Sequence, residues 1–343
     1  MIWCAVAVAC LAATLRASPA GASFPGRNGS FAIQLDGCED TPFVRLFTVG
    51  GKPLGALTPP CEVVGQVDED DVLRETSLHD WSPDGQRLLL SQSGAPPLGL
   101  ITRAADGTDL RSVPAPSTAT DASFGPGGRH IVFMSKGSVW RMPSDGGQRQ
   151  RLRPALTCKL EVRDCVDFQH PRWSPDGRFI SFEVSQSGWG SGGPPRVKPG
   201  LWLMNARTGK LIRRVAREAF DADWAPDSRR LVYRTSYEQD EIKGGASGGT
   251  IWVVSVSGKR ARRLVHRHRL AETVPRWSPD GRWIAWVSLR LGKGDVGFDV
   301  KPSLWRVRAG GGAPRRITGL PSPTVEEGDF LAPQLAWQPL PGG

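Results

Sequence analysis

Short runs in which apolar and polar residues alternate recur along most of this chain, and Gly, Pro, Asp or Ser bound almost every run. A period of two residues predicts half-buried β-strands, whereas an amphipathic helix would repeat every 3.6 residues. No helical period competes with this pattern. The clearest predicted strands are Arg87–Ser91, His130–Met134, Phe179–Phe182, Leu231–Tyr233 and Trp283–Val287. The chain is therefore expected to be all-β.

A single five-residue motif, Trp-Ser-Pro-Asp-Gly or a close variant, stands immediately before these strands. Its copies are Trp81–Gly85, Phe124–Gly128, Trp173–Gly177, Trp224–Ser228 and Trp277–Gly281, with a degenerate sixth copy that begins at Trp337. Successive copies are 43, 49, 51, 53 and 60 residues apart. Spacings of this size are typical of β-propeller blades that carry loop insertions.

The residue types of the motif predict a strand, a tight turn and a second strand. Pro presets φ, an Asp side chain can bond its own backbone, and Gly accepts positive φ. The Asp residues are Asp84, Asp176, Asp227 and Asp280, and the Gly residues are Gly85, Gly177 and Gly281. Two copies depart from the pattern, because Phe124–Gly128 lacks the Asp and Trp224–Ser228 lacks the final Gly.

The two ends of the chain complement each other. After each motif come a third strand, often marked by Trp, a Gly-rich turn and an Arg-rich fourth strand, which makes four strands per blade. Only three strands precede the first motif, near Ser30–Leu35, Phe43–Val49 and Leu54–Thr58, and one follows the last, near Leu335–Gln338. We therefore predict a six-bladed propeller whose C-terminal strand joins the N-terminal blade and removes both open sheet edges.

The repeated motif resembles the WD40-like repeat of TolB-type β-propellers, over roughly residues 24 to 340. The segment Phe24–Gly29 is also similar to the mature start of exported bacterial members. The resemblance implies a propeller fold, but it leaves the function open, since the family includes periplasmic scaffold proteins, propeller domains of peptidases and some lyases.

The N-terminus has the pattern of an export signal. Ile2–Leu15 is apolar and too short to span a bilayer, and Ala20–Ala22 is a small-residue cleavage site that would leave Ser23 as the mature start. Residues 1–22 are thus predicted to be a signal peptide, and residues 23–343 a single propeller domain. The alternative is a buried first strand, since no Lys or Arg precedes the apolar run.

Four cysteines would remain after cleavage, an even number that favours two disulfides in an exported chain. By strand order, all four fall in connections on the face where the inner strands begin, which also carries nearly all the long loops and is here called the long-loop face. The predicted pairs are Cys38 with Cys61 and Cys158 with Cys165. The alternative is that all four stay reduced.

Charged residues at the start of the inner strands are the candidate binding site, because they should ring the channel mouth on the long-loop face. They are His79, Asp80, Asp121, His170, Arg172, Asp221, Asp223, Glu272 and Arg276. Such a ring suits a peptide or small polar ligand. In the alternative interpretation these groups pair with one another and with channel water.

Sequence motifs for catalysis, metals and cofactors are absent. No zinc-protease helix or phosphate-binding Gly loop occurs. Asp68–Asp71 is read as a solvated acidic run rather than a Ca²⁺ site, and Arg267 between His266 and His268 would repel a cation. The expectation is therefore a non-catalytic, monomeric, exported propeller that binds a protein or peptide on the long-loop face, without cofactor or metal. The alternative is a lyase- or hydrolase-like enzyme that acts on a polyanionic sugar through His170 and Arg172.

Composition and charge fit this interpretation. Gly (41) and Pro (29) supply the many turns, and the net charge of +10 makes nucleic acid a possible partner. Export and the lack of an aromatic and basic stacking surface argue against nucleic acid. Much of the positive charge lies on the fourth strands, where it would protect exposed edges, at Arg149, Arg151, Arg153, Arg213, Arg214, Arg260, Arg262, Arg263, Arg315 and Arg316.

Overall fold

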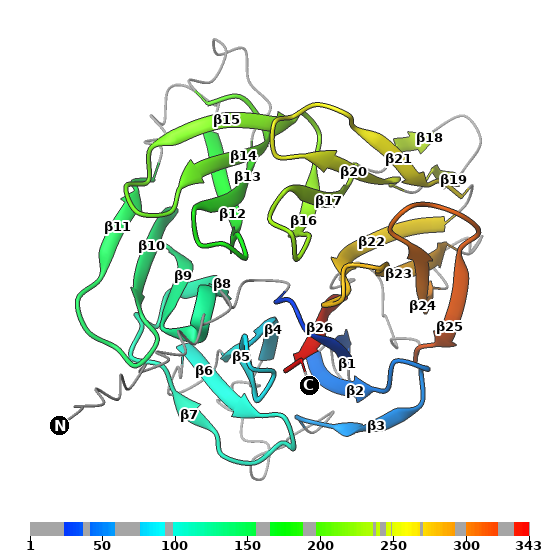
Figure 1. Ribbon diagram of the computed structural model, residues 1–343, viewed down its shortest axis with the longest axis horizontal. Coiled ribbons are helices and arrows are strands. Elements are labelled where there is room, and N and C mark those ends of the chain that lie inside the picture. The colour runs from blue at the N-terminus through cyan, green and yellow to red at the C-terminus, as the bar shows by residue number, and fades with distance from the viewer. Residues whose placement is uncertain are drawn as a thin grey trace, which may run out of the picture.

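Six four-stranded antiparallel sheets stand around a central channel (Figure 1). The computed structural model describes residues 24–36, 42–58, 76–92, 99–155, 165–187, 197–235, 238–240, 245–247, 249–267, 270–291, 300–321 and 333–342. The six-bladed all-β propeller predicted from the repeat is confirmed.

Each blade has its innermost strand at the channel and its fourth strand at the outer rim. From the channel outward, blade 1 consists of β26 (Gln334–Leu340), β1 (Arg27–Asp36), β2 (Pro42–Phe47) and β3 (Pro53–Ala56). Blade 2 consists of β4 (Thr76–Trp81), β5 (Arg87–Gln92), β6 (Gly99–Ala104) and β7 (Arg111–Ser112). Blade 3 consists of β8 (Ala119–Phe124), β9 (His130–Ser135), β10 (Ser138–Pro143) and β11 (Gln150–Arg153), with a 3₁₀ turn, η2 (Pro126–Gly128), after β8.

The other three blades repeat this order. Blade 4 consists of β12 (Cys165–Trp173), β13 (Phe179–Ser187), β14 (Gly200–Asn205) and β15 (Leu211–Ala216). Blade 5 consists of β16 (Phe220–Trp224), β17 (Arg230–Arg234), β20 (Ile251–Ser255) and β21 (Arg262–Val265), with an additional hairpin of β18 (Glu238–Asp240) and β19 (Gly245–Ser247). Blade 6 consists of β22 (Leu270–Trp277), β23 (Trp283–Leu291), β24 (Val300–Arg308) and β25 (Arg315–Gly319).

The C-terminal strand closes the ring as the sequence predicted. β26 pairs antiparallel with β1, with Phe31 opposite Trp337 and Ile33 opposite Leu335. The rings of Phe31 and Trp337 lie 4.4 Å apart between their centroids. Closure therefore joins the two ends of the chain through a buried aromatic pair as well as through the hydrogen-bonded ladder.

The side-chain contacts that recur in the turn motif explain why the inner strand reverses so sharply. In blade 6 the Ser278 hydroxyl donates to Asp280 (2.6 Å) and accepts from the N–H of Trp283 (2.9 Å). The same pair of contacts occurs at Ser82 and Ser174. Two features require glycine at Gly85. Its φ is +68°, and an added Cβ would lie 2.0 Å from the carbonyl oxygen of Pro339.

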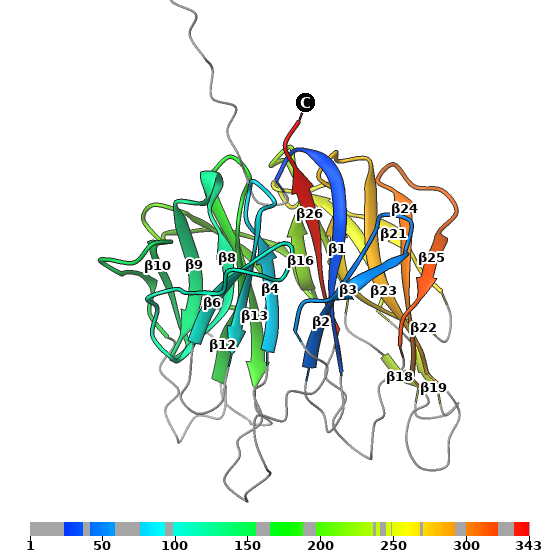
Figure 2. The same cartoon turned by 90° about the horizontal axis from the view of Figure 1, so that it is seen from below.

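The inner strands end at one face of the disc with these turns, where the C-terminal end of β26 also lies (Figure 2). We call this the tight-turn face. Each inner strand begins at the opposite, long-loop face. The core lies between blades, where large aromatic side chains of the motif are buried, among them Trp81, Trp224 and Trp277.

Arginine stems cover aromatic side chains around the ring. Arg178 lies over Phe179, Arg230 over Trp277, and Arg306 and Arg308 over Trp283, with guanidinium to centroid distances of 4.7 to 5.1 Å. Part of the excess of positively charged residues therefore takes part in cation–π contacts with aromatic side chains.

Several predictions fall on residues outside the described ranges. These are the signal peptide at 1–22, the acidic run Asp68–Asp71, His268, most of the long loops, and Cys38, Cys61 and Cys158; Cys165 lies in β12, but its side chain is not described. Within the described part of the chain, no helix is both long and apolar enough to cross a membrane.

Candidate functional site

Bulges in the inner strands turn charged side chains toward the channel. Asp121, His170 and Asp221 each lie three residues before the motif aromatic of their blade and have φ of +48°, +47° and +54°. At each position the inner strand loses register with its neighbour. A non-glycine residue in this region is strained by about 1 kcal/mol or more. Val274 stands at the same place in blade 6 with φ of +42°, so the bulge is a feature of the repeat and the site is distinguished by its charged side chains.

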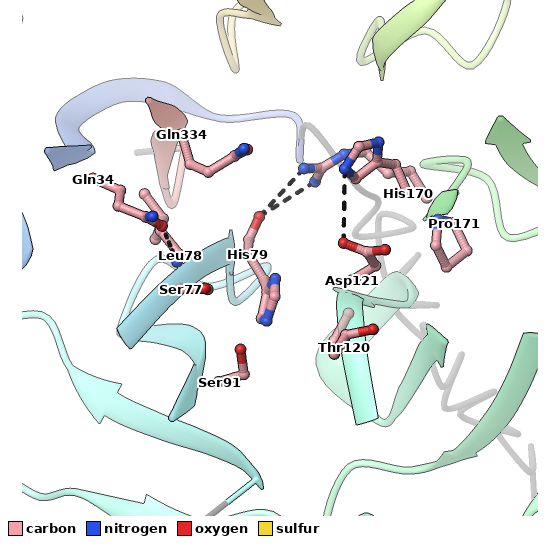
Figure 3. A pocket seen from close by; sticks show the side chains of 12 residues that line it. Gln34, Ser77, Leu78, His79, Ser91, Thr120, Asp121, His170, Pro171 and Gln334 are labelled. Atoms are coloured by element: carbon pink, nitrogen blue, oxygen red, sulfur yellow. Dashed lines mark hydrogen bonds and ion pairs between the residues drawn. The ribbon is translucent and has the colours of Figure 1, made fainter. Parts of the chain in front are cut away.

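A cavity of about 370 Å³ occupies the channel at the long-loop end (Figure 3). It is lined by the early part of β4 and β8, the bulge of β12, the end of β1 and the start of β26. Four of the nine predicted site residues line it: His79, Asp121, His170 and Arg172. The channel therefore brings together groups from blades 2, 3 and 4 that lie far apart in the sequence.

His170 is held between two carboxylates. Its Nδ1 lies 3.2 Å from Oε2 of Glu183 and its Nε2 lies 3.7 Å from Oδ1 of Asp121. Burial by itself would lower the pKa of His170, but the charges of Glu183, Asp121 and Asp221 outweigh burial and raise it to about 9. The imidazole is therefore positively charged at neutral pH.

His79 is in the opposite state. The residue is 9% exposed, and its buried Nε2 has no hydrogen-bond partner among the described residues. Burial, and after it the positive charges of Arg172 and His170, outweigh the attraction of Asp121 and lower the pKa of His79 to about 4. The cavity thus combines a neutral imidazole with an unused nitrogen, a charged imidazole and a carboxylate.

Asp80 and Asp223 serve the contacts between blades. Asp80 accepts from the N–H of Trp81 (2.9 Å) and from the N–H of Phe124 in the next blade (3.3 Å). Asp223 stands at the equivalent place in blade 5 and accepts from the N–H of Trp277 in blade 6 (2.8 Å). Both carboxylates precede the motif aromatic, so each joins its blade to the next one.

Arg172 and Arg276 each join different blades beside the channel. Both terminal nitrogens of Arg172 donate to the carbonyl of His79, each at 3.4 Å. Arg276 is 5% exposed and donates to the carbonyls of Leu335 (2.8 Å) and Asp221 (3.1 Å). Burial lowers the pKa of Arg276 to about 10, so it remains charged. Arg172 lines the cavity, whereas Arg276 joins blade 6 to blades 1 and 5.

Asp221 and Glu272 are neutralised by arginines of their own surroundings. Arg234 lies 2.5 Å from Asp221, and although burial alone would raise the pKa of Asp221, Arg234 and His170 lower it. Glu272 is fully buried, binds Arg267 at 2.7 Å and accepts from the indole of Trp286. Glu272 therefore lies inside blade 6 and does not line the cavity.

The structure adds residues that the sequence pattern did not single out. Glu183 on β13 is 2% exposed, contacts His170 and accepts from the N–H of Ala222 (3.0 Å). Gln34 and Gln334 also line the cavity, and Gln34 accepts from the N–H of Leu78 (2.7 Å). A Glu in a strand whose other residues, apart from Ser181, are apolar (Phe179–Val184) was the available signal for Glu183.

The described residues include no group of three or more His, Cys, Asp or Glu side chains that could hold a metal ion. The described lining combines hydrogen-bonding and charged side chains with the apolar Leu78, Ala122 and Pro171.

Comparisons with known proteins agree with the architecture. No family model matches the chain. The "Uncharacterized peptidase YuxL" of Bacillus subtilis (strain 168) is 25% identical over 140 residues, which are 39% of this chain and only 19% of that protein. Among solved structures, "putative TolB" of Agrobacterium tumefaciens has 18% identity and a TM-score of 0.55, over 86% of this chain and 90% of that one.

A second solved structure, the hydrazine synthase of Kuenenia stuttgartiensis, matches with a TM-score of 0.54 and 11% identity, over 91% of this chain and 47% of that one. At these identities the likeness is one of fold alone. The resemblance to TolB-type propellers that the repeat motif indicated is thus confirmed for the fold of this chain.

Proposed function

We propose that this protein is a non-catalytic, exported propeller that binds a protein or peptide partner on its long-loop face. The channel cavity receives polar groups of that partner. The observation that carries the proposal is the cavity itself, where His79, Asp121 and His170 from three different blades come together.

The chemistry of the cavity suits a polar segment of a polypeptide. Neutral His79 can accept a hydrogen bond, charged His170 can donate one, and Asp121 can accept one. The imidazole of His170 and the carboxylate of Asp121 are 32% and 29% exposed, so a ligand can reach both. Main-chain amides and amide side chains offer the matching donors and acceptors.

Capture experiments with cavity variants test the proposal. The mature protein, with His79→Leu or Asp121→Asn, is immobilised and used to capture partners from the extracytoplasmic fraction. The matched control is Arg111→Gln, on the tight-turn half of blade 2, where the side chain is 65% exposed. We expect both cavity variants to lose a partner that wild type and the control retain. Identical partner sets for all four proteins would overturn the proposal.

One observation favours the alternative of an enzyme. His79 and His170 share a cavity but have pKa values of about 4 and about 9, and two such groups can serve as a general base and a general acid. The alternative is a lyase- or hydrolase-like activity on a polyanionic sugar. Release of unsaturated or reducing ends from such a sugar by wild type, abolished in His170→Gln, would establish it. No turnover by wild type would exclude that class of substrate.

Export, domain limits and disulfides form part of the proposal. We propose residues 1–22 as a cleaved signal peptide, residues 23–343 as one domain, and the pairs Cys38–Cys61 and Cys158–Cys165 as disulfides. Intact mass and N-terminal sequencing of protein recovered from the exported fraction test all three. Ser23 at the N-terminus and peptides linked in these two pairs are expected; an uncleaved start or free thiols would contradict the corresponding part.

A further inference from the structure

Blade 6 contains a second, smaller pocket with a strongly basic lining. Its volume is about 290 Å³, and it is lined by Leu270, Ser288, Arg290, Lys301, Ser303, Trp305 and Arg316. The pocket includes the first residue of β22 and thus lies toward the long-loop face, on another blade than the channel cavity. The channel-site proposal uses none of these residues, so the two proposals can fail separately.

Three cations from three neighbouring strands meet in this pocket. Arg290 on β23 stands directly opposite Lys301 on β24, and Arg316 on β25 pairs with Trp305 on β24. Like charges directly opposite each other on neighbouring strands destabilise a sheet. Within the described part of the chain, neither Arg290 nor Arg316 forms an ion pair. An anion in the pocket would be attracted by the guanidinium groups of Arg290 and Arg316.

A buried hydroxyl in the pocket lacks a partner as well. Ser288 is 1% exposed, and its Oγ has no hydrogen-bond partner among the described residues. Directly across the ladder, the hydroxyl of Ser303 makes only a 3.4 Å contact as a donor, to the carbonyl of Ser288. Both hydroxyls can therefore donate to an acceptor in the pocket.

No carboxylate is among the described residues that line the pocket. The indole of Trp305 donates to Ser303 (2.9 Å), and the guanidinium of Arg267 lies 3.8 Å from the centroid of the indole. The neighbouring acid, Glu272, is already bound by Arg267 through both of its oxygens, at 2.7 and 2.9 Å. Glu272 therefore does not offset the charge of Arg290 or Arg316.

We infer that this pocket binds a tetrahedral oxyanion, phosphate or sulfate, either as a free ion or as a monoester group of a larger ligand. Arg290, Lys301 and Arg316 supply the charge, and Ser288 with Ser303 supplies hydroxyl donors. Hydrogen bonds to charged acceptors are stronger than neutral ones, which makes an oxyanion the best-matched occupant. The volume leaves room for hydration water or for the group that carries the ester.

Titration calorimetry of the full mature protein at constant ionic strength tests the inference, with inorganic phosphate and inorganic sulfate as probes and chloride as background. We expect saturable binding of at least one oxyanion. Arg290→Gln and Arg316→Gln should each weaken it about tenfold. The matched control is Arg315→Gln, which removes the same charge from the neighbouring position of β25. Equal affinity for wild type and both pocket variants, or equal weakening by the control, would overturn the inference.

Ser288→Ala separates an effect on oxyanion binding from an effect on folding stability. Because the hydroxyl has no partner among the described residues, its removal should leave the thermal midpoint unchanged or raise it, while weakening oxyanion binding about fivefold or more. A lower midpoint with unchanged affinity would contradict the inference. O-phosphoserine as a further probe identifies the source: tighter binding than inorganic phosphate supports an oxyanion carried by a ligand, and weaker binding supports a free ion.

Discussion

The carboxylate of Glu183 binds His170 with one oxygen, at 3.2 Å from Nδ1, and with the other accepts a hydrogen bond from the N–H of Ala222 in the next blade, at 3.0 Å. Glu183 thus connects the charge of the channel to the packing of blade 4 against blade 5. Glu183, which is buried, therefore keeps His170 protonated without taking part in ligand contacts itself.

Glu183→Gln should lower the pKa of His170. The variant keeps a hydrogen-bonding side chain but loses the charge that opposes burial, so we expect the pKa to fall from about 9 by about 1 to 3 pH units. NMR titration of the imidazole Cε1 proton measures it. Asp121→Asn serves as comparison and should lower the pKa less, because Asp121 is 3.7 Å away. An unchanged pKa in Glu183→Gln would contradict the assignment.

The same pair predicts how stability responds to alkaline pH. The pKa of His170 in the folded state is about 9, above its ordinary value of 6.5, so the stabilisation is complete below pH 6.5 and is lost as the pH rises through about 9. The imidazole is 32% exposed, and with solvent screening we expect a loss of about 1–2 kcal/mol. Urea unfolding at pH 6.5 and pH 9.5 should show this loss in wild type and much less of it in Glu183→Gln.

His79→Leu should stabilise the protein, and increasingly so in acid. Burial holds the pKa of His79 at about 4, so the wild type loses stability as the pH falls from 6.5 to about 4, by up to about 3 kcal/mol. Leu cannot be protonated. It also replaces a buried nitrogen that has no hydrogen-bond partner among the described residues. The difference in unfolding free energy between variant and wild type should therefore grow on acidification, as measured by urea unfolding at pH 7, 5.5 and 4.5.

The neighbouring Asp80 makes stability change with pH in the opposite direction to His79, so the two contributions can be told apart. Burial raises the pKa of Asp80 to about 6, so its ionisation costs stability as the pH rises from about 4 to about 6. The two slopes oppose each other in wild type, and only that of Asp80 remains in His79→Leu. A pH profile parallel to that of wild type would show that His79 is not held neutral.

Asp223→Ala should be the more damaging of two equivalent substitutions between blades. It leaves the N–H of Trp277 without its 2.8 Å acceptor, and an unsatisfied buried donor costs about 1–3 kcal/mol. Asp80→Ala removes longer contacts between the blades, 3.1 Å to the hydroxyl of Ser123 and 3.3 Å to the N–H of Phe124, and also removes a carboxylate that burial disfavours. Urea unfolding at pH 7 should show a larger loss of unfolding free energy for Asp223→Ala than for Asp80→Ala. The reverse order would contradict this account of the contacts between blades.

Gly125→Ser should destabilise blade 3, although it restores the residue found at this place in three other blades. A Cβ at Gly125 would lie 2.8 Å from the Trp173 ring, closer than real side-chain contacts allow. We expect a loss of about 1–3 kcal/mol, typical of overpacking. Ser174→Gly is the converse change and should also destabilise, since Ser174 holds Asp176 and the N–H of Phe179. A stabilised Gly125→Ser would contradict the packing argument.

The strands, the turns and the closure of the ring follow from local chemistry, and the sequence predicted them well. Pro, Asp and Gly in fixed order specify the turn at Trp81–Gly85 and its repeats, and alternation specifies the strands on either side. The count of three strands before the first motif and one after the last was sufficient to predict the pairing of β26 with β1.

The chemistry of the channel depends on contacts between blades, which the local pattern does not contain. Alternation predicts that Asp121 and His170 lie near the channel mouth, but the bulges that turn them inward appear only in the register of the folded strands. Asp80 and Asp223 have the same residue type as Asp121, yet they accept N–H groups of the following blade. Their partners are Phe124 and Trp277, 44 and 54 residues away in the chain. An Asp carboxylate accepts a hydrogen bond from whichever donor lies within about 3 Å of it. The tertiary structure therefore decides whether such a side chain remains available to a ligand or joins two blades.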